Sequence, residues 1–255
     1  MVRGLYTAIS GMIVQEAKQD VISNNLANMD TVGFKSDDLH SQSFEDVLIQ
    51  NYSNKENGVP ERTILGYLNL GSKVDETSTD FTGGEIKSTD KDTDFAIEGR
   101  GFFTVNKDGQ NYYTRNGHFH VNMDGYLMDD AGDYVMGKNI ATNAQEPIKI
   151  GDGDITCDGY GTLSVNGVPQ YSLELADFND YNTLKKVGDN LYQGDNPIMN
   201  SGVRVENKAL EGSNVNVMQG ITDMMTTMRE FESNQKMVQD IDSTVGKAAN
   251  DVGKV

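Results

Sequence analysis

The sequence has a single cysteine, no tryptophan, four prolines and few basic residues. Because Cys157 stands alone, an intramolecular disulfide and a cysteine-based metal cluster are both excluded. The 39 acidic against 21 basic residues give a net charge of −18, which argues against a nucleic-acid binder and against attraction to an anionic membrane. An acidic surface is also an ordinary route to solubility, so the charge points to no particular partner.

Long apolar runs are also missing. No stretch approaches the roughly 20 apolar residues that a membrane span requires. Near the start the longest run is Met12-Ile13-Val14, followed by polar residues, so we expect no cleavable secretory signal. These absences suggest the cytoplasm, unless the protein leaves the cell by a route that needs no such signal.

The first 27 residues carry a helical pattern. Apolar residues recur at gaps of three and four, which places them on one side of a helix: Leu5, Ile9, Met12, Ile13, Ala17, Val21, Ile22 and Leu26. No proline interrupts this run, and the segment from Asp30 to Gly33 supplies a stop. The pattern predicts a helix from Val2 to about Ala27.

The last 40 residues carry a stricter pattern, with alternating gaps of four and three. Seven of its nine positions are apolar: Val217, Ile221, Met224, Met228, Phe231, Gln235, Val238, Asp242 and Val245. A period of 3.5 residues is typical of a coiled-coil seam. Ser213 or Asn214 would be a good N-cap, and a helix over 215–250 would be about 54 Å long. Such a seam requires a helical partner.

Between the ends the pattern changes twice. The polar segment 36–80 shows a short helical patch around Phe44–Ile49. Residues 81–205 show short apolar alternations separated by six turn pairs: Gly83-Gly84, Asp108-Gly109, Asn116-Gly117, Asp124-Gly125, Asp158-Gly159 and Asn166-Gly167. Because Asn-Gly and Asp-Gly suit tight hairpins, these pairs predict an antiparallel β domain.

The expected fold class is α+β: two terminal amphipathic helices form a coiled coil, and the chain between them forms a central, mainly antiparallel β domain. The expected segments are 1–35 (N-terminal helix), 36–80 (extended linker or hairpin), 81–205 (β domain) and 209–255 (C-terminal helix).

The candidate chemistry is weak. The Asp-rich stretches Asp152-Gly-Asp154 and Asp124 to Asp133 lack the register of an EF-hand loop. His118 and His120 fall on one strand face without an evident third metal ligand. No Gly-x-Ser-x-Gly motif occurs. We expect no catalytic residues, no metal site and no cofactor.

Three motifs resemble the flagellar basal-body rod and hook proteins. They are Ser23-Asn24-Asn25-Leu26-Ala27-Asn28 with Thr31-Val32-Gly33-Phe34-Lys35, then Asp94–Phe103 with Tyr113-Thr114-Arg115-Asn116-Gly117, and finally Leu210–Val217. They span nearly the whole chain. The length and the terminal layout fit the proximal and distal rod subunits, and the residues do not separate the two.

The resemblance implies a structural subunit and not an enzyme. It implies export through the flagellar type III apparatus without a cleaved signal, and a location in the basal body outside the cytoplasmic membrane. Implied partners are identical subunits and other rod and hook proteins, with terminal helices lining an inner coiled-coil layer of a helical tube that transmits torque.

Asn24, Asn25, Asn28 and Gly33 would end the first helix and redirect the chain, and Ser213, Asn214 and Asn216 would start the second. The expected assembly interface comprises Leu5, Ile9, Met12, Asn24, Asn25, Leu26, Asn28, Gly33, Asn214, Val217, Ile221, Met224, Met228, Phe231, Val238 and Val245.

A binding module and an enzyme are the two alternatives to a structural subunit. The acidic β domain could be a binding module for a ring protein or a cell-wall component. A wall hydrolase would need paired carboxylates, yet adjacent residues such as Asp129 and Asp130 point to opposite faces of a strand.

Overall fold

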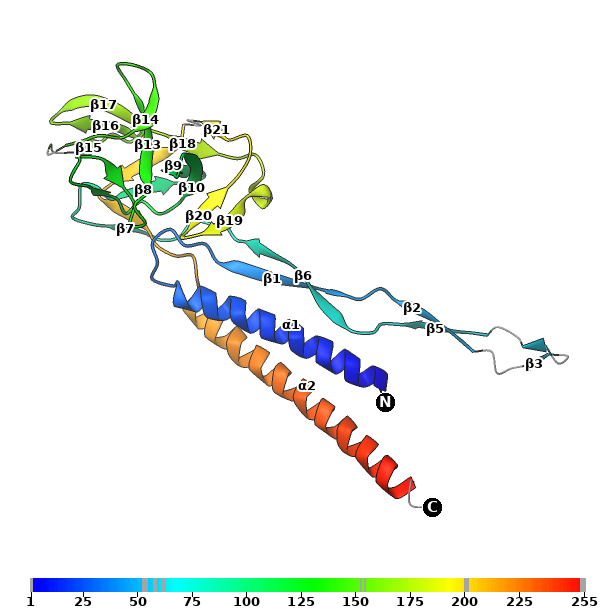
Figure 1. Ribbon diagram of the computed structural model, residues 1–255. Coiled ribbons are helices and arrows are strands. Elements are labelled where there is room, and N and C mark those ends of the chain that lie inside the picture. Colours follow the sequence, from blue (N-terminus) through cyan, green and yellow to red (C-terminus); the bar gives the residue numbers. More distant parts are fainter. Residues whose placement is uncertain are drawn as a thin grey trace. The chain divides into compact units, whose positions relative to one another are not determined.

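The computed structural model describes residues 2–51, 55–56, 59–60, 63–151, 153, 155–199 and 202–252. The chain forms two compact units (Figure 1). The helical unit contains Met1–Leu26, Asp37–Ser78 and Val217–Val255, and the β unit contains Ala27–Ser36 and Thr79–Asn216. Helices lie at both ends of the sequence, and the strand pairs between them are antiparallel, so the predicted α+β class is confirmed.

The helical unit is built on two long helices, α1 (Val2–Ala27) and α2 (Val217–Val252). They are antiparallel: a Cβ added at Gly4 would lie 3.6 Å from Ile241 Cδ1, and one added at Gly220 would lie 3.0 Å from Leu26 Cδ2. Gln15 Nε2 donates a hydrogen bond to Glu230 Oε2 at 2.7 Å. The absence of side chains at these glycines lets the helices approach closely.

The same unit contains a two-stranded ribbon. Its strands pair as β1 (Asp37–Ser43) with β6 (Ser72–Thr79), β2 (Val47–Asn51) with β5 (Thr63–Leu68), and β3 (Lys55–Glu56) with β4 (Val59–Pro60). The prediction of a helical patch at Phe44–Ile49 is therefore wrong. Val47, Leu48 and Ile49 pair with Leu68, Tyr67 and Gly66 across the ribbon. The run is apolar and two of its three residues are β-branched, which suits a pleated surface.

Hydrogen bonds between side chains of α1 and the backbone of the ribbon segment join the two. Thr7 Oγ1 donates to Leu70 O at 3.3 Å, and the backbone N–H of Ser72 donates to Ser10 Oγ at 3.3 Å. α1 thus contacts α2 on one side and the ribbon on another.

The β unit is dominated by one large antiparallel sheet, whose central path runs β15-β16-β17-β13-β9-β10-β20-β19. Those strands are β9 (Phe102–Lys107), β10 (Gln110–Thr114), β13 (Tyr134–Asn139), β15 (Ile155–Cys157), β16 (Thr162–Val165), β17 (Val168–Leu173), β19 (Lys185–Gly188) and β20 (Leu191–Gln193). Attached to it are β11 (His120–Val121), β12 (Leu127–Met128), β14 (Gln145–Pro147), β18 (Leu175–Asp177) and β21 (Ile198–Met199), and a 3-10 turn, η1, spans Tyr181–Thr183.

Two small strand pairs connect the ends of this unit. β8 (Phe95–Glu98) pairs with β22 (Arg204–Asn207), and β7 (Ile86–Ser88) pairs with β23 (Ala209–Glu211). β23 is the last strand before α2 in the sequence.

Two of the predicted turn pairs are the central residues of two-residue hairpins. Asp108 and Gly109, between β9 and β10, have φ of 52° and 82°, and Asn166 and Gly167, between β16 and β17, have φ of 52° and 79°. Both φ values are positive in each pair, as a type I′ turn requires. Asn116-Gly117 plays another part, because a Cβ on Gly117 would overlap Phe95 O.

The core of the β unit forms two clusters of apolar side chains. The larger contains Phe95, Phe103, Phe119, Ile148 and Leu163, all at most 1 % exposed. The smaller is aromatic and includes Phe102, Phe178 and Tyr192. Phe81, which lies between β6 and β7, packs edge-on against Phe102 and Tyr192, so this cluster holds the segment that enters the unit.

Candidate assembly faces and a buried ionic junction

α2 presents two different faces. Its less exposed positions recur with gaps of four and three: Gly220, Met224, Thr227, Phe231, Asn234, Val238 and Ile241. A Cβ added at Gly11 of α1 would lie 3.1 Å from Asn234 Nδ2, so this face is directed at α1. The seam read from the sequence coincides with it only at Met224, Phe231 and Val238.

The remaining residues of that seam are exposed. Val217, Ile221, Met228 and Val245 are 38 to 47 % exposed, and Gln235 and Asp242 are also exposed. The neighbouring Met225 is 51 % exposed. The structure therefore leaves an apolar stripe on α2, defined by Val217, Ile221, Met225 and Met228, that α1 does not cover.

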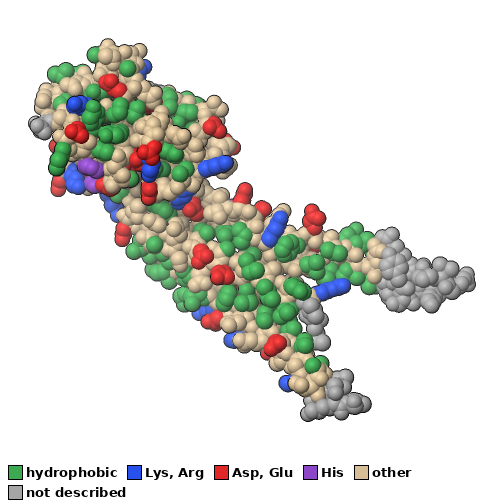
Figure 2. All heavy atoms as spheres, in the orientation of Figure 1, with side chains coloured by type: hydrophobic (Ala, Val, Ile, Leu, Met, Phe, Trp, Pro, Cys, Tyr) green, Lys and Arg blue, Asp and Glu red, His purple; other side chains and the backbone are tan. Residues whose placement is uncertain are grey.

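α1 shows a similar division. Leu5, Met12 and Leu26 are half-buried, while Ile9 is 39 % exposed. The helix buries Ala8 and Val14, which the sequence reading left out of the interface, because α1 is covered by the ribbon as well as by α2. Tyr6, Ile9 and Ile13 form a second exposed stripe. Hydrophobic side chains are visible over the helices and the ribbon in Figure 2.

Asn24 and Asn25 lie in the last turn of α1, and their surroundings differ. Asn24 is exposed, whereas Asn25 is half-buried. The Asn25 side chain donates to Asp37 O at 2.8 Å and accepts from the Asp37 N–H at 3.0 Å, which holds the start of β1 against the helix. Asn28 lies beyond the helix, where its Oδ1 accepts from Thr31 Oγ1 at 3.2 Å.

Gly33 lies in a turn of the β unit at φ +68°, and a Cβ there would overlap the Arg115 backbone. Its N–H donates to Glu211 O at 2.8 Å. A residue with a side chain would be strained at this φ and would displace Arg115. Gly33 thus brings the loop after α1 against the strand that precedes α2.

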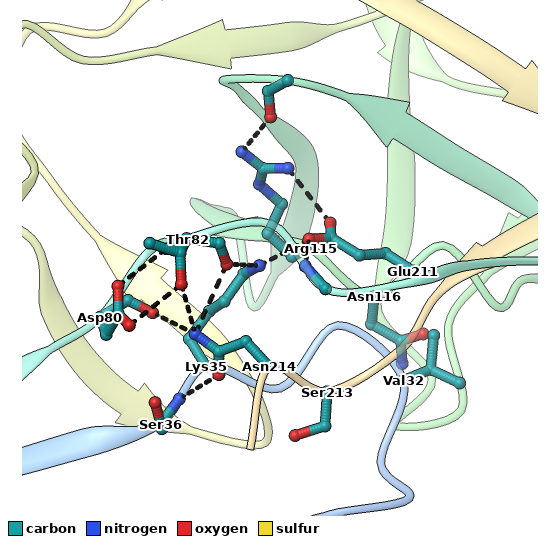
Figure 3. A network of polar contacts seen from close by, with 12 residues as sticks. Val32, Lys35, Ser36, Asp80, Thr82, Arg115, Asn116, Glu211, Ser213 and Asn214 are labelled. Carbon is teal, nitrogen blue, oxygen red and sulfur yellow. Dashed lines mark hydrogen bonds and ion pairs between the residues drawn. The ribbon is translucent and has the colours of Figure 1, made fainter. Parts of the chain in front are cut away.

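Asn214 does not cap α2, which begins three residues later at Val217; the expectation that Ser213 or Asn214 starts the helix is wrong. Asn214 Oδ1 instead accepts from the Ser36 N–H at 2.8 Å, and its Nδ2 donates to Asp80 O at 2.8 Å (Figure 3). The side chain joins three segments that are far apart in sequence. Ser213 Oγ accepts from the Val215 N–H at 3.3 Å.

Beside Asn214 lies a buried ionic junction made of Lys35, Arg115 and Glu211 (Figure 3). Lys35 Nζ is 2.5 Å from Glu211 Oε1 and donates to Thr82 O at 2.7 Å. Arg115 donates to Glu211 Oε2 at 3.1 Å and to Gly99 O at 2.7 Å. The three side chains are 0 to 2 % exposed, so one carboxylate faces two buried cations.

Burial lowers the pKa of the Lys35 ammonium, while the hydrogen bond and charge of Glu211 oppose this by raising it. Desolvation disfavours a charged group, and a close opposite charge restores it. The junction contains fixed ion pairs and backbone hydrogen bonds, which makes it a clamp between segments rather than a site for proton transfer.

The sequence reading missed all three junction residues. Each nevertheless lies inside one of the motifs that resemble the family: Lys35 after Gly33-Phe34, Arg115 within Thr114–Asn116, and Glu211 within Leu210–Gly212. A charged residue inside an apolar or glycine-containing motif was the signal that could have identified them as buried ion-pair partners.

The structure gives little support to a histidine or metal site. His118 is not a free surface histidine, because its Nδ1 lies 2.8 Å from Asp94 Oδ1. Among the residues that the structure describes, no three His, Cys, Asp or Glu side chains are grouped to hold a metal ion. Asp152 and Asp154 lie outside those residues. Within the same described part of the chain, no helix has both the length and the apolar character to cross a membrane.

Comparisons with known proteins agree with this arrangement of ends and centre. Residues 5–35 match the family model described as flagella basal body rod protein, and residues 96–165 match the flagellar hook protein FlgE/F/G D1 domain. Residues 206–251 match the flagellar basal body rod FlgEFG protein C-terminal model.

Full-length relatives are found as well. The chain is 30 % identical to the flagellar hook-basal body complex protein FlhO of Bacillus subtilis, over 100 % of both chains. It is 32 % identical to the flagellar basal-body rod protein FlgG of Buchnera aphidicola subsp. Schizaphis graminum, over 97 % of this chain and 98 % of the relative. It is 29 % identical to the rod protein FlgF of Caulobacter vibrioides, over 100 % of both.

These matches favour a rod protein over a separate binding module, and the family is structural rather than enzymatic. Membership implies a place in the basal-body rod and assembly with other rod and hook proteins. Family models over both ends and the centre, together with relatives at about 30 % identity along the full length, show that this chain belongs to the flagellar basal-body rod proteins of the FlgF/FlgG type.

Proposed function

We propose that this rod subunit associates with identical copies through the exposed stripes of α1 and α2, and so builds a helical tube that transmits torque from motor to hook. The observation that carries the proposal is the apolar stripe Val217, Ile221, Met225 and Met228, which stays 38 to 51 % exposed although α1 already covers another face of α2. Contiguous exposed apolar surface in a monomer marks an interaction site.

The chemistry of the stripe suits repeated contacts between copies. Its methionines, Met225 and Met228, are flexible and polarizable, so they can repack against neighbours in slightly different settings. The stripe on α1, formed by Tyr6, Ile9 and Ile13, adds a second apolar surface. A helix with two apolar faces can pack against two neighbours at once.

The proposal includes a coiled coil. The covered positions of α2, from Gly220 to Ile241, follow gaps of four and three, which is the spacing of a coiled-coil seam. In this arrangement α1 and α2 of one chain form the first pair, and the outward stripes add helices from neighbouring copies. We assign Asn24, in the last turn of α1, and Val245, near the C-terminal end of α2, to the margins of this proposed interface.

The route and the location complete the proposal. The chain passes through the flagellar type III export apparatus without a cleaved signal peptide and assembles outside the cytoplasmic membrane, in the periplasmic or cell-wall zone. The proposal rests on the match of both terminal segments to the rod family.

The test is the double substitution Ile221→Glu and Met228→Glu in the full chain. Both side chains are exposed, so the monomer should keep its far-UV circular dichroism, while two carboxylates in a helix–helix interface should abolish packing between copies. In a deletion strain, the variant should be secreted at the normal level yet be missing from purified basal bodies, and motility should be lost.

Thr226→Glu is the matched control, because Thr226 is exposed on α2 but lies on a different side of the helix from Ile221 and Met228. It should assemble normally. Rods of normal yield with the double variant would refute the role of the α2 stripe.

A further inference from the structure

We propose that Lys35, Arg115, Glu211 and Asn214 form a terminal latch that makes two segments of the β unit depend on each other for order. The segments are Ala27–Ser36, which follows α1, and 209–214, which precedes α2. This goes beyond building a rod: it concerns when a chain becomes competent to do so.

The two segments supply each other's hydrogen-bond partners. The Gly33 N–H donates to Glu211 O at 2.8 Å, and the Ser36 N–H donates to Asn214 Oδ1 at 2.8 Å. In the other direction, the Asn214 N–H donates to Phe34 O at 3.4 Å. Removing either segment therefore leaves backbone groups of the other without these partners, which is costly where they are buried.

The charges make the dependence stronger. Lys35 and Arg115 are both buried, and Glu211 is the carboxylate that faces them both. A buried cation without its anionic partner is strongly unfavourable, whereas a buried ion pair whose charges cancel is tolerated. Until Glu211 is in place, the interior cannot accept Lys35, so the loop that carries it cannot dock.

The backbone leaves no room for a looser arrangement. A Cβ at Gly33 would overlap the Arg115 backbone, and one at Gly84 would overlap Gly212 O. Gly84 N–H also donates to Glu211 Oε1 at 3.0 Å. The carboxylate thus binds three segments in a fixed geometry, and a partly docked state would lose several of these contacts together.

The order of these residues in the chain determines when the latch can close. Lys35 and Arg115 are made first, and Glu211 follows 96 residues after Arg115. A chain that emerges from its N-terminus therefore holds its first loop undocked until the strand before α2 has arrived. The latch closes only when the chain is nearly complete, so the segment Ala27–Ser36 stays undocked in incomplete chains.

The test is hydrogen exchange of backbone amides in the full-length protein. Glu211→Gln should raise exchange about tenfold or more at Gly33 and Ser36, far away in sequence. Lys35→Met should raise it at Gly212 and Asn214, but by less, because Arg115 and Glu211 remain a balanced pair. Reciprocal effects across the sequence are what a latch requires.

Glu206→Gln and Lys208→Met are the matched controls, since both residues are exposed near the same strands. Neither should change exchange in Ala27–Ser36. If Glu211→Gln does not fold, Asn214→Ala provides the milder variant: it keeps the ion pairs and should raise exchange at Ser36. Changes confined to the mutated segment, in all of these variants, would overturn the latch.

Discussion

Glu174 shows how a single buried carboxylate is managed in the β unit. It is 8 % exposed, and Gln145 Nε2 donates to both of its oxygens at 2.6 and 2.5 Å. Burial raises the pKa of Glu174, and the hydrogen bonds from Gln145 oppose this by lowering it. The net direction shows that the amide does not fully replace the lost hydration.

Glu174→Gln should therefore be neutral or stabilising by up to about 1 kcal/mol at pH 7, because it removes a buried charge and keeps an acceptor for Gln145. With a raised pKa, the folded protein takes up its proton before the unfolded chain as the pH falls. This group's contribution to wild-type stability thus improves between the raised pKa and the ordinary range of a glutamate. Urea unfolding at pH 7 and pH 4 should show the advantage of the variant shrinking.

A loss well above 1 kcal/mol at pH 7 would contradict this account, since the hydrogen bonds to the charged form would then outweigh its burial. Gln145→Ala serves as the control, because it leaves the Glu174 carboxylate buried without those hydrogen bonds and should destabilise the protein at pH 7 more than at pH 4.

At this scale the sequence was least informative. Lys35 and Glu211 are separated by 176 residues, and Arg115 and Glu211 by 96, so no local spacing reveals their contact. The roles of turn residues were easier to predict. Asp108-Gly109 is recognised as a hairpin turn from its own backbone preferences, without knowledge of contacts distant in the sequence.

At the scale of elements, the two helices approach through glycines. Gly4 and Gly11 on α1 face Ile241 and Asn234 on α2, and Gly220 faces Leu26. This explains why the seam read from the sequence and the face toward α1 differ. Apolar periodicity identifies the most hydrophobic face of α2, whereas the small residue Gly220 and the polar residue Asn234 on the other face permit contact with α1.

Gly11→Leu and Gly246→Leu form a matched pair of substitutions. A Cβ at Gly11 would already lie 3.1 Å from Asn234 Nδ2, so leucine should push the helices apart at a cost of about 1–3 kcal/mol. At Gly246 a Cβ meets nothing within 4 Å, and leucine should stabilise by up to about 1 kcal/mol through helix propensity. Thermal melts at 222 nm would measure both. Equal shifts would show that α1 and α2 are not packed at Gly11.

The ends of elements were predicted unevenly. α1 was predicted with its observed bounds, since its pattern is continuous and its stop signal is clear. The strand β2 was mistaken for a helical patch because a short apolar run has no decisive period, and its partner β5 lies 12 residues beyond the end of β2. Tertiary pairing decided between the two.

At the scale of the molecule, each unit is discontinuous in sequence, because the chain passes from one to the other four times: at the end of α1, before β1, at the end of β6 and before α2. The sequence indicated helical ends and a β centre. It did not indicate that Ala27–Ser36 belongs with the β unit, which follows from the contacts of Gly33, Lys35 and Ser36.

Two truncations separate the contributions of these parts. Removing 217–255 deletes α2 and keeps Glu211 and Asn214, so the β unit should retain a cooperative melt. Removing 209–255 also deletes β23 and leaves Lys35 and Arg115 without their carboxylate, which should lower the stability of the β unit by at least about 3 kcal/mol. Near-UV circular dichroism of the tyrosines, followed against temperature, would distinguish them. Identical melts for the two truncated proteins would contradict this view.

The sharing of one carboxylate between two cations also constrains how this sequence can drift over generations. A change at Lys35 leaves a balanced pair and one empty space, whereas a change at Glu211 leaves two positive charges in the interior. Substitutions at position 211 should therefore be tolerated only after both Lys35 and Arg115 have been replaced by uncharged residues, whereas a substitution at position 35 should be tolerated first. We therefore expect substitutions in this junction to accumulate in a fixed order, with the cations replaced before the carboxylate.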